Sequence, residues 1–295
     1  TALRMPLGGL LRGWGEALPG PLRNLAALGM LFIGGIWITR LIARNMILLE
    51  RTYMPAIIFL IVGCGSWYDP AALDLFAATL LMIGSFDRTI GSFRREVVYT
   101  HIFNASLLLG IALLTYAPAA VYIPLLPVAL VLFRKRWREW IVALAGLVLP
   151  TAICSYVWWA LGRPLTEVPV RLWEALCDTW YAPAFLVHWL NPLLLLLWAM
   201  IAVLTVWSLV IFARQAHSMR TRPYKSYLYF IWILFFSALP LIPPGRSVGE
   251  LMLLAVPLAV IIPTCFNRRE STWLGIAYLL LLVSMIAYNL FPVSL

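Results

Sequence analysis

Two carboxylates stand close together in the segment GCGSWYDPAALDLF, residues 63–76, between two long apolar runs. Asp69 and Asp74 are two of only twelve acidic residues in the chain. A carboxylate pair can serve as general acid and base or can hold a cation. An aspartate followed by proline is also typical of a helix N-cap. We expect Asp69 to cap a helix that begins at Pro70, and of these two candidate catalytic residues we prefer Asp74.

Further candidates are cations and a histidine in the same predicted set of loops. Arg163, Arg171 and Arg246 can hold a lipid phosphate, because a guanidinium group binds phosphate oxygens in a bidentate manner. His188 can act as a general base. The simpler interpretation is that amphipathic surface helices always carry such residues. The four cysteines lack CxxC spacing and no two histidines are four residues apart, so we expect no metal and no cofactor.

The elements that position these residues must be membrane helices. Apolar residues make up 63% of the chain, charged residues only 12%, and the mean hydropathy is +0.92. A soluble domain has an apolar content of roughly half. Apolar runs near the ~20 residues that cross a bilayer recur along the chain, and its 14 Trp and 12 Tyr, many near the run ends, fit interfacial belts. The fold class predicted is all-α, a polytopic transmembrane helical bundle.

We predict about ten spans in this chain. They cover residues 24–43, 54–66, 70–86, 102–116, 118–134, 138–161, 190–213, 226–242, 248–264 and 272–291. Prolines interrupt the fifth, sixth and ninth of these spans. Since a broken helix needs neighbours that satisfy its freed carbonyl groups, we expect these three spans to lie inside the bundle.

The basic residues predict the orientation. Of the 22 Lys and Arg residues, six fall in one alternating set of loops (Arg4, Arg12, Arg23, Arg163, Arg171 and Arg246), which leaves sixteen in the other. The positive-inside rule places the sixteen in the cytoplasm. Residues 1–23 and the C-terminus are then on the outer side of a bacterial inner membrane, and we expect one more helix upstream of Thr1. The net charge of +10 therefore reflects topology rather than nucleic-acid binding.

The chain divides into four predicted parts. Residues 1–23 form an outer amphipathic segment, and residues 24–161 form an N-terminal membrane module. Residues 162–191 form a large outer loop, in which VRLWEALCDTW has the apolar spacing of an amphipathic helix lying on the membrane surface. Residues 192–295 supply the C-terminal membrane helices.

Two resemblances bear on function. The runs YMPAIIFL and WREWIVALAGLVLP resemble those of a family of bacterial inner-membrane proteins of unassigned function. The segment ASLLLGIALLTYAPAAVYIPLLPVALVLFRKRWREWIVALAGLVLP resembles the glycine-rich helix, turn, helix, basic loop and helix of GT-C glycosyltransferases, and the order of elements is similar over about residues 24–190. That resemblance implies a polyprenyl-phosphate sugar donor at the outer leaflet. Those enzymes carry an essential acid in the first outer loop, where this chain offers only Glu16.

These observations leave several functions open. We expect a non-catalytic scaffold subunit of a cell-envelope complex, built on a GT-C-like bundle, with membrane lipids and other membrane proteins as partners. The alternative is a GT-C-like transferase or ligase that acts on a polyprenyl-linked sugar at the outer leaflet and binds polyprenyl phosphate. A transporter is a third possibility, which we disfavour because the sequence shows no convincing internal repeat.

Overall fold

The computed structural model describes residues 5–48, 52–65, 72–94, 98–178, 192–215, 219, 221–239, 251–266 and 272–290. All regular elements in these ranges are helical, which confirms the all-α prediction. The α-helices are α1 (Pro6–Ala17), α2 (Gly20–Asn45), α3 (Met54–Gly65), α4 (Leu73–Gly91), α5 (Tyr99–Thr115), α6 (Leu125–Leu132), α7 (Trp137–Ala160), α8 (Glu167–Asp178), α10 (Pro192–Gln215), α11 (Thr221–Ala238), α12 (Leu251–Ile261), α13 (Pro263–Phe266) and α14 (Thr272–Leu290). Two 3-10 helices, η1 (Ser92–Arg94) and η2 (Ala117–Tyr122), complete the set.

Three of the described helices are long and apolar enough to cross a membrane. They are α2, α7 and the part of α10 that runs from Leu195 to Gln215. Four shorter apolar helical stretches accompany them, at Met54–Gly65, Tyr99–Thr115, Ala117–Leu132 and Leu251–Phe266. By length and composition the first three reach the ~20 residues that cross a bilayer core, whereas the four shorter stretches do not.

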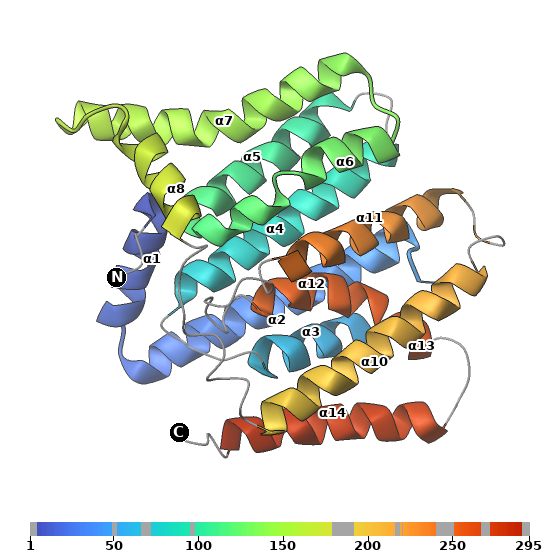
Figure 1. Cartoon of the computed structure of the whole chain (residues 1–295). Helices are drawn as coiled ribbons and strands as arrows, with labels where there is room; N and C mark the ends of the chain where they lie inside the picture. The colour runs from blue at the N-terminus through green and yellow to red at the C-terminus, as the bar shows by residue number, and fades with distance from the viewer. Residues whose placement is uncertain are drawn as a thin grey trace.

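The helices form one bundle in which neighbours in sequence are mostly neighbours in space (Figure 1). α5 packs between α4 and α7, and α2 packs on α3 and α4. α12 packs against α3 and α11, and α10 packs along α14. A single large apolar cluster runs through this arrangement, and its members come from helices as distant in sequence as α2 and α14.

The prolines have different consequences in different helices. Every residue of α12 is buried, so Pro257 lies among neighbouring helices as predicted. The predicted span 118–134 is instead divided into η2 and α6, with Pro118 in the first turn of η2 and Pro124 as the N-cap of α6. α7 contradicts the prediction that its proline places it inside the bundle. It lies at the edge of the bundle, and only a narrow face that includes Pro150 is buried (Figure 1).

That narrow face is a close crossing of α7 over α5. Gly146 lies against the Ser106 hydroxyl, and a Cβ atom added to it would come within 2.7 Å of the Phe103 carbonyl oxygen. A Cβ atom added to Gly110 would come within 2.7 Å of the Leu147 carbonyl oxygen. Glycine at both positions lets the two backbones approach, which is the usual way that helices pack when lipid surrounds them. The crossing holds α7 on the bundle although most of its surface is free.

The two predicted surface helices are confirmed as helices. α1 buries Gly8 and Gly15 and exposes Leu10 and Trp14. α8 buries Val168 and Ala175 while Val170 and Trp173 stay exposed. Both lie at the same end of the bundle (Figure 1), which we call the α8 end. The opposite end, which contains Ser92–Arg94, is the η1 end.

The α5–α7 crossing predicts that Gly146→Ala destabilises the fold. The added methyl group meets the Ser106 hydroxyl and the Phe103 backbone, and overpacking of this kind costs about 1–3 kcal/mol. Thermal unfolding in detergent should show a lower Tm. The control is Gly29→Ala in α2, where a Cβ atom meets nothing within 4 Å, and where alanine should leave Tm equal or raise it. Equal Tm values for Gly146→Ala and the unchanged protein would contradict the crossing.

Candidate functional site

α7 ends in a glycine turn that brings Arg163 over the ring of Trp158. Gly162 has a φ of +85°, a left-handed conformation that favours glycine. The Gly162 N–H donates to the Trp159 carbonyl at 2.9 Å, and the Arg163 N–H donates to the Trp158 carbonyl at 3.1 Å. This is the Schellman pattern of helix termination. It leaves the guanidinium carbon of Arg163 4.6 Å from the ring centre of Trp158.

α8 then supplies a carboxylate and a second guanidinium. Oε1 of Glu167 accepts from Arg163 at 3.3 Å and from Arg171 at 2.6 Å. The guanidinium carbon of Arg171 lies 5.0 Å from the ring centre of Trp158. The spacing of four residues places Glu167 and Arg171 on one face of α8, and Arg163 reaches Glu167 from the turn that precedes the helix. Trp158, Arg163, Glu167 and Arg171 together form what we call the α8 corner.

The α8 corner has one more positive than negative charge and stays in contact with solvent. The side chains of Arg163 and Arg171 are 53% and 36% exposed, and that of Glu167 is 19% exposed. Each guanidinium has both a carboxylate and an indole face as partners. Such contacts add a few tenths of a kcal/mol to about 1 kcal/mol each at exposed sites. The corner therefore fixes the angle between α7 and α8 and leaves some guanidinium surface for an anion.

Asp74 lies beside α1 rather than in an open groove. A Cβ atom added to Gly8 would lie 3.7 Å from Cβ of Asp74 and would collide with the Thr115 carbonyl group. Glycine is therefore required for α1 to lie across α4 and α5, which it contacts. Asp74 is in the first turn of α4, where a carboxylate is stabilised by the helix dipole. Asp74 therefore has a favourable place at the helix terminus, although the N-cap of α4 is Ala72.

A small apolar junction links α1 with α8. Met5, Ala117 and Ala175 are buried against one another, with Leu172 packed on them. These residues precede α1, begin η2 and lie on α8. Leu172 directly follows Arg171 in the sequence. The junction packs both α1, which lies beside Asp74, and α8, which carries Arg171, against η2. Both predicted site residues therefore lie at the α8 end.

The remaining predicted site residues lie outside the described ranges. These are Asp69, His188 and Arg246. The predicted start of the helix at Pro70 is wrong, because α4 begins at Leu73 with Ala72 as its N-cap. Glu16, the acid in the first outer segment, is exposed on α1. Among the described residues, no group of three His, Cys, Asp or Glu side chains is placed to hold a metal ion.

Trp158 was not identified from the sequence as a member of the site. The contact between Glu167 and Arg171 could be predicted from their spacing, because residues four apart on a helix are neighbours. The contact of the two arginines with Trp158 could not be predicted from the sequence, because it depends on the chain reversal at Gly162.

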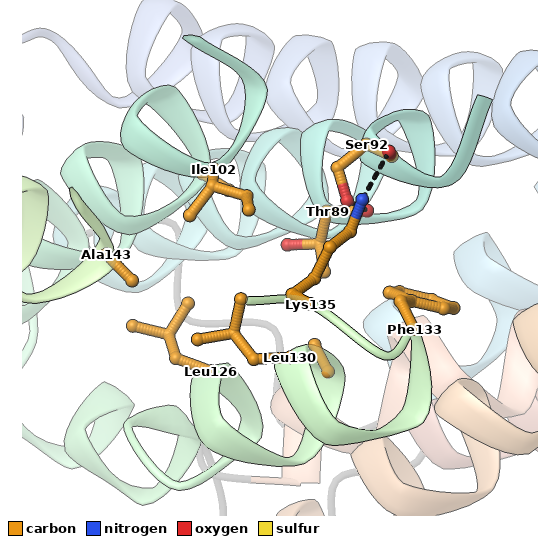
Figure 2. A pocket seen from close by; sticks show the side chains of 10 residues that line it. Thr89, Ser92, Ile102, Leu126, Leu130, Phe133, Lys135 and Ala143 are labelled. Atoms are coloured by element: carbon orange, nitrogen blue, oxygen red, sulfur yellow. Dashed lines mark hydrogen bonds between the residues drawn. The ribbon is translucent and has the colours of Figure 1, made fainter. Parts of the chain in front are cut away.

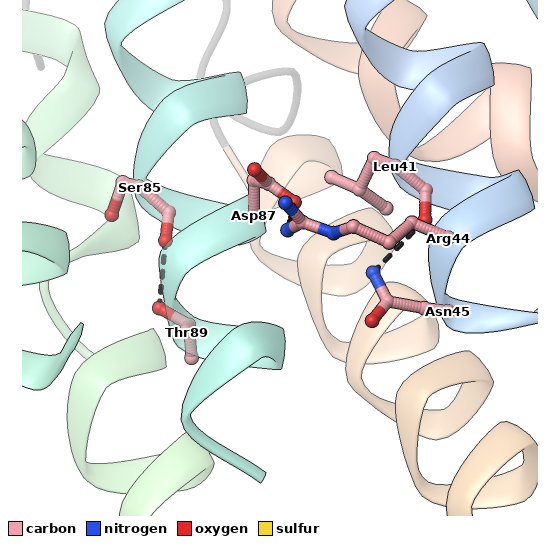
Figure 3. A network of polar contacts seen from close by, with 6 residues as sticks. All are labelled: Leu41, Arg44, Asn45, Ser85, Asp87 and Thr89. Atoms are coloured by element: carbon pink, nitrogen blue, oxygen red, sulfur yellow. Dashed lines mark hydrogen bonds and ion pairs between the residues drawn. The ribbon is translucent and has the colours of Figure 1, made fainter. Parts of the chain in front are cut away.

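The η1 end carries two further polar contacts between elements. The Lys135 ammonium donates to the Ser92 carbonyl at 2.9 Å, from the connection between α6 and α7 (Figure 2). Arg44 of α2 forms an ion pair with Asp87 of α4 (Figure 3). The Asp87 side chain is 11% exposed and that of Arg44 is 47% exposed. Basic residues that we interpreted only as topology signals thus also join helices.

Glu167→Gln tests the α8 corner. The amide cannot neutralise two guanidinium groups, so α8 should open more readily, by about 0.5–1 kcal/mol. Hydrogen exchange of the α8 amides should become roughly two- to fivefold faster. Glu174→Gln is the matched control, because Glu174 is an exposed acid on the same helix. Equal exchange in the two variants would show that the corner does not hold α8.

Arg44→Gln tests the ion pair at the η1 end. The substitution leaves the nearly buried Asp87 carboxylate without its partner, a loss of about 1–3 kcal/mol. Thermal unfolding should show a lower Tm than for Arg40→Gln, a control one turn earlier on α2 at an exposed position. Adding Asp87→Asn to Arg44→Gln should restore part of the loss, because no charge is then left unpaired. A double variant as unstable as the sum of the single variants would contradict the pairing.

No protein-family model, curated protein or solved structure matches this chain. Similarity to known proteins therefore suggests no activity for this chain. The resemblance to GT-C enzymes therefore stays a prediction from the order of elements in the sequence. What the chain does has to be inferred from its own residues.

Proposed function

We propose that this chain is a multi-pass protein of the bacterial inner membrane, with about ten crossings and with the α8 end on the outer side. The support is the way the charged contacts separate. Arg44, Asp87 and Lys135 meet their partners at the η1 end, and the α8 corner lies at the other end. The large apolar cluster lies between them. Two polar ends around an apolar middle match a bilayer with a hydrocarbon core of ~30 Å.

Within that membrane we propose a non-catalytic role, as a scaffold subunit of a cell-envelope complex. One observation carries this choice: the described residues that we proposed for catalysis or phosphate binding have structural partners. Arg163 and Arg171 are both held by Glu167 and Trp158. Asp74 lies in the first turn of α4 beside Gly8 of α1. These side chains stabilise the α8 end, which suits a protein that presents a fixed surface.

The free side of α7 is the surface that such a subunit would offer. α7 packs mainly on α5 through its glycine face. Its other faces expose large apolar side chains, among them Ile141, Leu144, Val148, Ile153 and Val157. In a bilayer these side chains contact acyl chains or the helices of a partner. We propose that another membrane protein packs along this side.

The second candidate function is a GT-C-like transferase acting on a polyprenyl-linked sugar. The observation that favours it is the pair of guanidinium groups at the α8 corner. Both lie over the Trp158 ring, and both are partly exposed. Two adjacent guanidinium groups are suited to a phosphate ester. In this function the phosphate competes with Glu167 for both arginines.

Mass spectrometry of the full chain extracted in native lipids separates the two functions. We expect a protein partner at a stoichiometric ratio and no retained polyprenyl phosphate. A polyprenyl phosphate that is retained by the protein and lost in Arg171→Gln would favour the transferase instead. Arg12→Gln on α1 is the matched control, because it removes another arginine from the same end. Extraction without any stoichiometric protein would contradict the scaffold.

A further inference from the structure

The η1 segment at the end of α4 gathers cations from two other parts of the chain. Lys225 and Arg222 of α11 lie over the ring of Phe93, with the Lys225 ammonium 5.6 Å and the Arg222 guanidinium carbon 5.9 Å from its centre. Lys135 reaches the carbonyl of the preceding residue, Ser92, from the α6–α7 connection. Three cations, one from the α6–α7 connection and two from α11, thus lie around two consecutive residues. We call Lys135, Arg222 and Lys225 the η1 cation cluster.

The backbone of the α6–α7 connection is shaped to hold Lys135 in this place. Arg134 has a φ of +53°, a conformation that residues other than glycine rarely adopt. Its N–H donates to the Val131 carbonyl at 3.0 Å, and the Lys135 N–H donates to the Leu130 carbonyl at 2.8 Å. The chain therefore ends α6 with a glycine-type turn although no glycine is present. The result directs Lys135 back toward η1.

Lys135 is partly buried where it lies. Its side chain lines a cavity of about 10 Å³ whose other walls are mostly apolar, with Leu126 and Ala143 at the far end from the ammonium group (Figure 2). A cavity of that size holds about one water molecule. Burial lowers the pKa of Lys135, while the nearby Glu139 acts in the opposite direction. An ammonium ion in this environment gains from an additional anionic partner.

Positive charge dominates the groups that face the cluster. Glu139, in the first turn of α7, is the acid that acts on Lys135, and it is 8% exposed. Asp87 is already paired with Arg44. Within the described residues, neither Arg222 nor Lys225 forms a salt bridge. Among the described residues, Glu139 is thus the carboxylate that acts on Lys135, and the two cations of α11 have no ion-pair partner.

Apolar side chains flank the cluster on the membrane side. Val131, at the end of α6, is 66% exposed, and Trp137 and Ile141, at the start of α7, are also exposed. An exposed tryptophan beside cations at the end of a membrane helix is typical of the level of the lipid headgroups. These exposed apolar residues are close to Lys135 in the sequence and suit contact with an acyl chain.

We propose that the η1 cation cluster binds the phosphate of an anionic phospholipid of the inner leaflet, with Lys135, Arg222 and Lys225 as its ligands. A phosphodiester offers acceptor oxygens to all three side chains, and basic pockets between helices on the cytoplasmic side suit such headgroups. A zwitterionic lipid carries an ammonium group that the cluster repels. This inference rests on the proposed membrane orientation but not on the scaffold role.

The test uses the full chain, delipidated in detergent, with dioleoylphosphatidylglycerol, dioleoylphosphatidylcholine or inorganic phosphate added at equal concentrations. Native mass spectrometry counts bound lipid, and thermal unfolding measures the shift in Tm. We expect phosphatidylglycerol to bind at least about tenfold more tightly than phosphatidylcholine. It should also raise Tm, whereas inorganic phosphate should not. A Tm shift with inorganic phosphate as large as that with phosphatidylglycerol would overturn the lipid assignment.

Variants localise the site. Arg222→Gln combined with Lys225→Gln should weaken phosphatidylglycerol binding about tenfold or more. The exchange Arg222→Lys with Lys225→Arg keeps both charges and should keep binding, which separates loss of charge from loss of fold. Arg40→Gln, at an exposed position on α2, should bind like the unchanged protein. Equal binding by the double glutamine variant and the unchanged protein would overturn the proposal, whereas the outcome of the partner extraction bears only on the scaffold.

Discussion

The structure depends on the close contact between α5 and α7. Without Gly110 and Gly146, the two backbones could not approach to the distance that they have. α7 has few other attachments, because most of its surface is exposed. Yet both ends of α7 carry polar features. Trp158 anchors the α8 corner at one end, and the connection that contains Lys135 enters at the other. The position of α7 on α5 therefore sets the geometry of both ends at once.

The two ends handle positive charge in different ways. At the α8 corner two guanidinium groups share Glu167 and the face of Trp158, so each has partners within the fold. At the η1 end three cations surround Phe93 and Ser92, with Glu139 as the nearby acid. Cations that are not neutralised by acidic groups of the protein attract an external anion. This difference is why we assign a structural role to the first set and a ligand to the second.

Asp74 and α7 show where reasoning from the sequence succeeded and where it failed. The presence of a helix after the GCGSWYDPAALDLF segment was predictable from its apolar run, but its first residue was not. The helix starts at Leu73 rather than at Pro70, which places Asp74 in its first turn. The proline in α7 predicted burial. The helix instead buries only the proline face, because Gly110 of α5 leaves room for the ring of Pro150.

The sequence by itself determined the all-helical class, the apolar character of the spans and the two amphipathic surface helices. These properties follow from hydropathy and periodicity, which are local and do not depend on neighbours. Only the tertiary structure decided which charges are compensated. The spacing of Arg163, Glu167 and Arg171 is visible in the chain, but the indole beneath them is brought there by a chain reversal. Likewise Lys135 and Lys225 are far apart in sequence, and both reach the η1 segment because α4 and α6 end, and α11 begins, at the same end of the bundle.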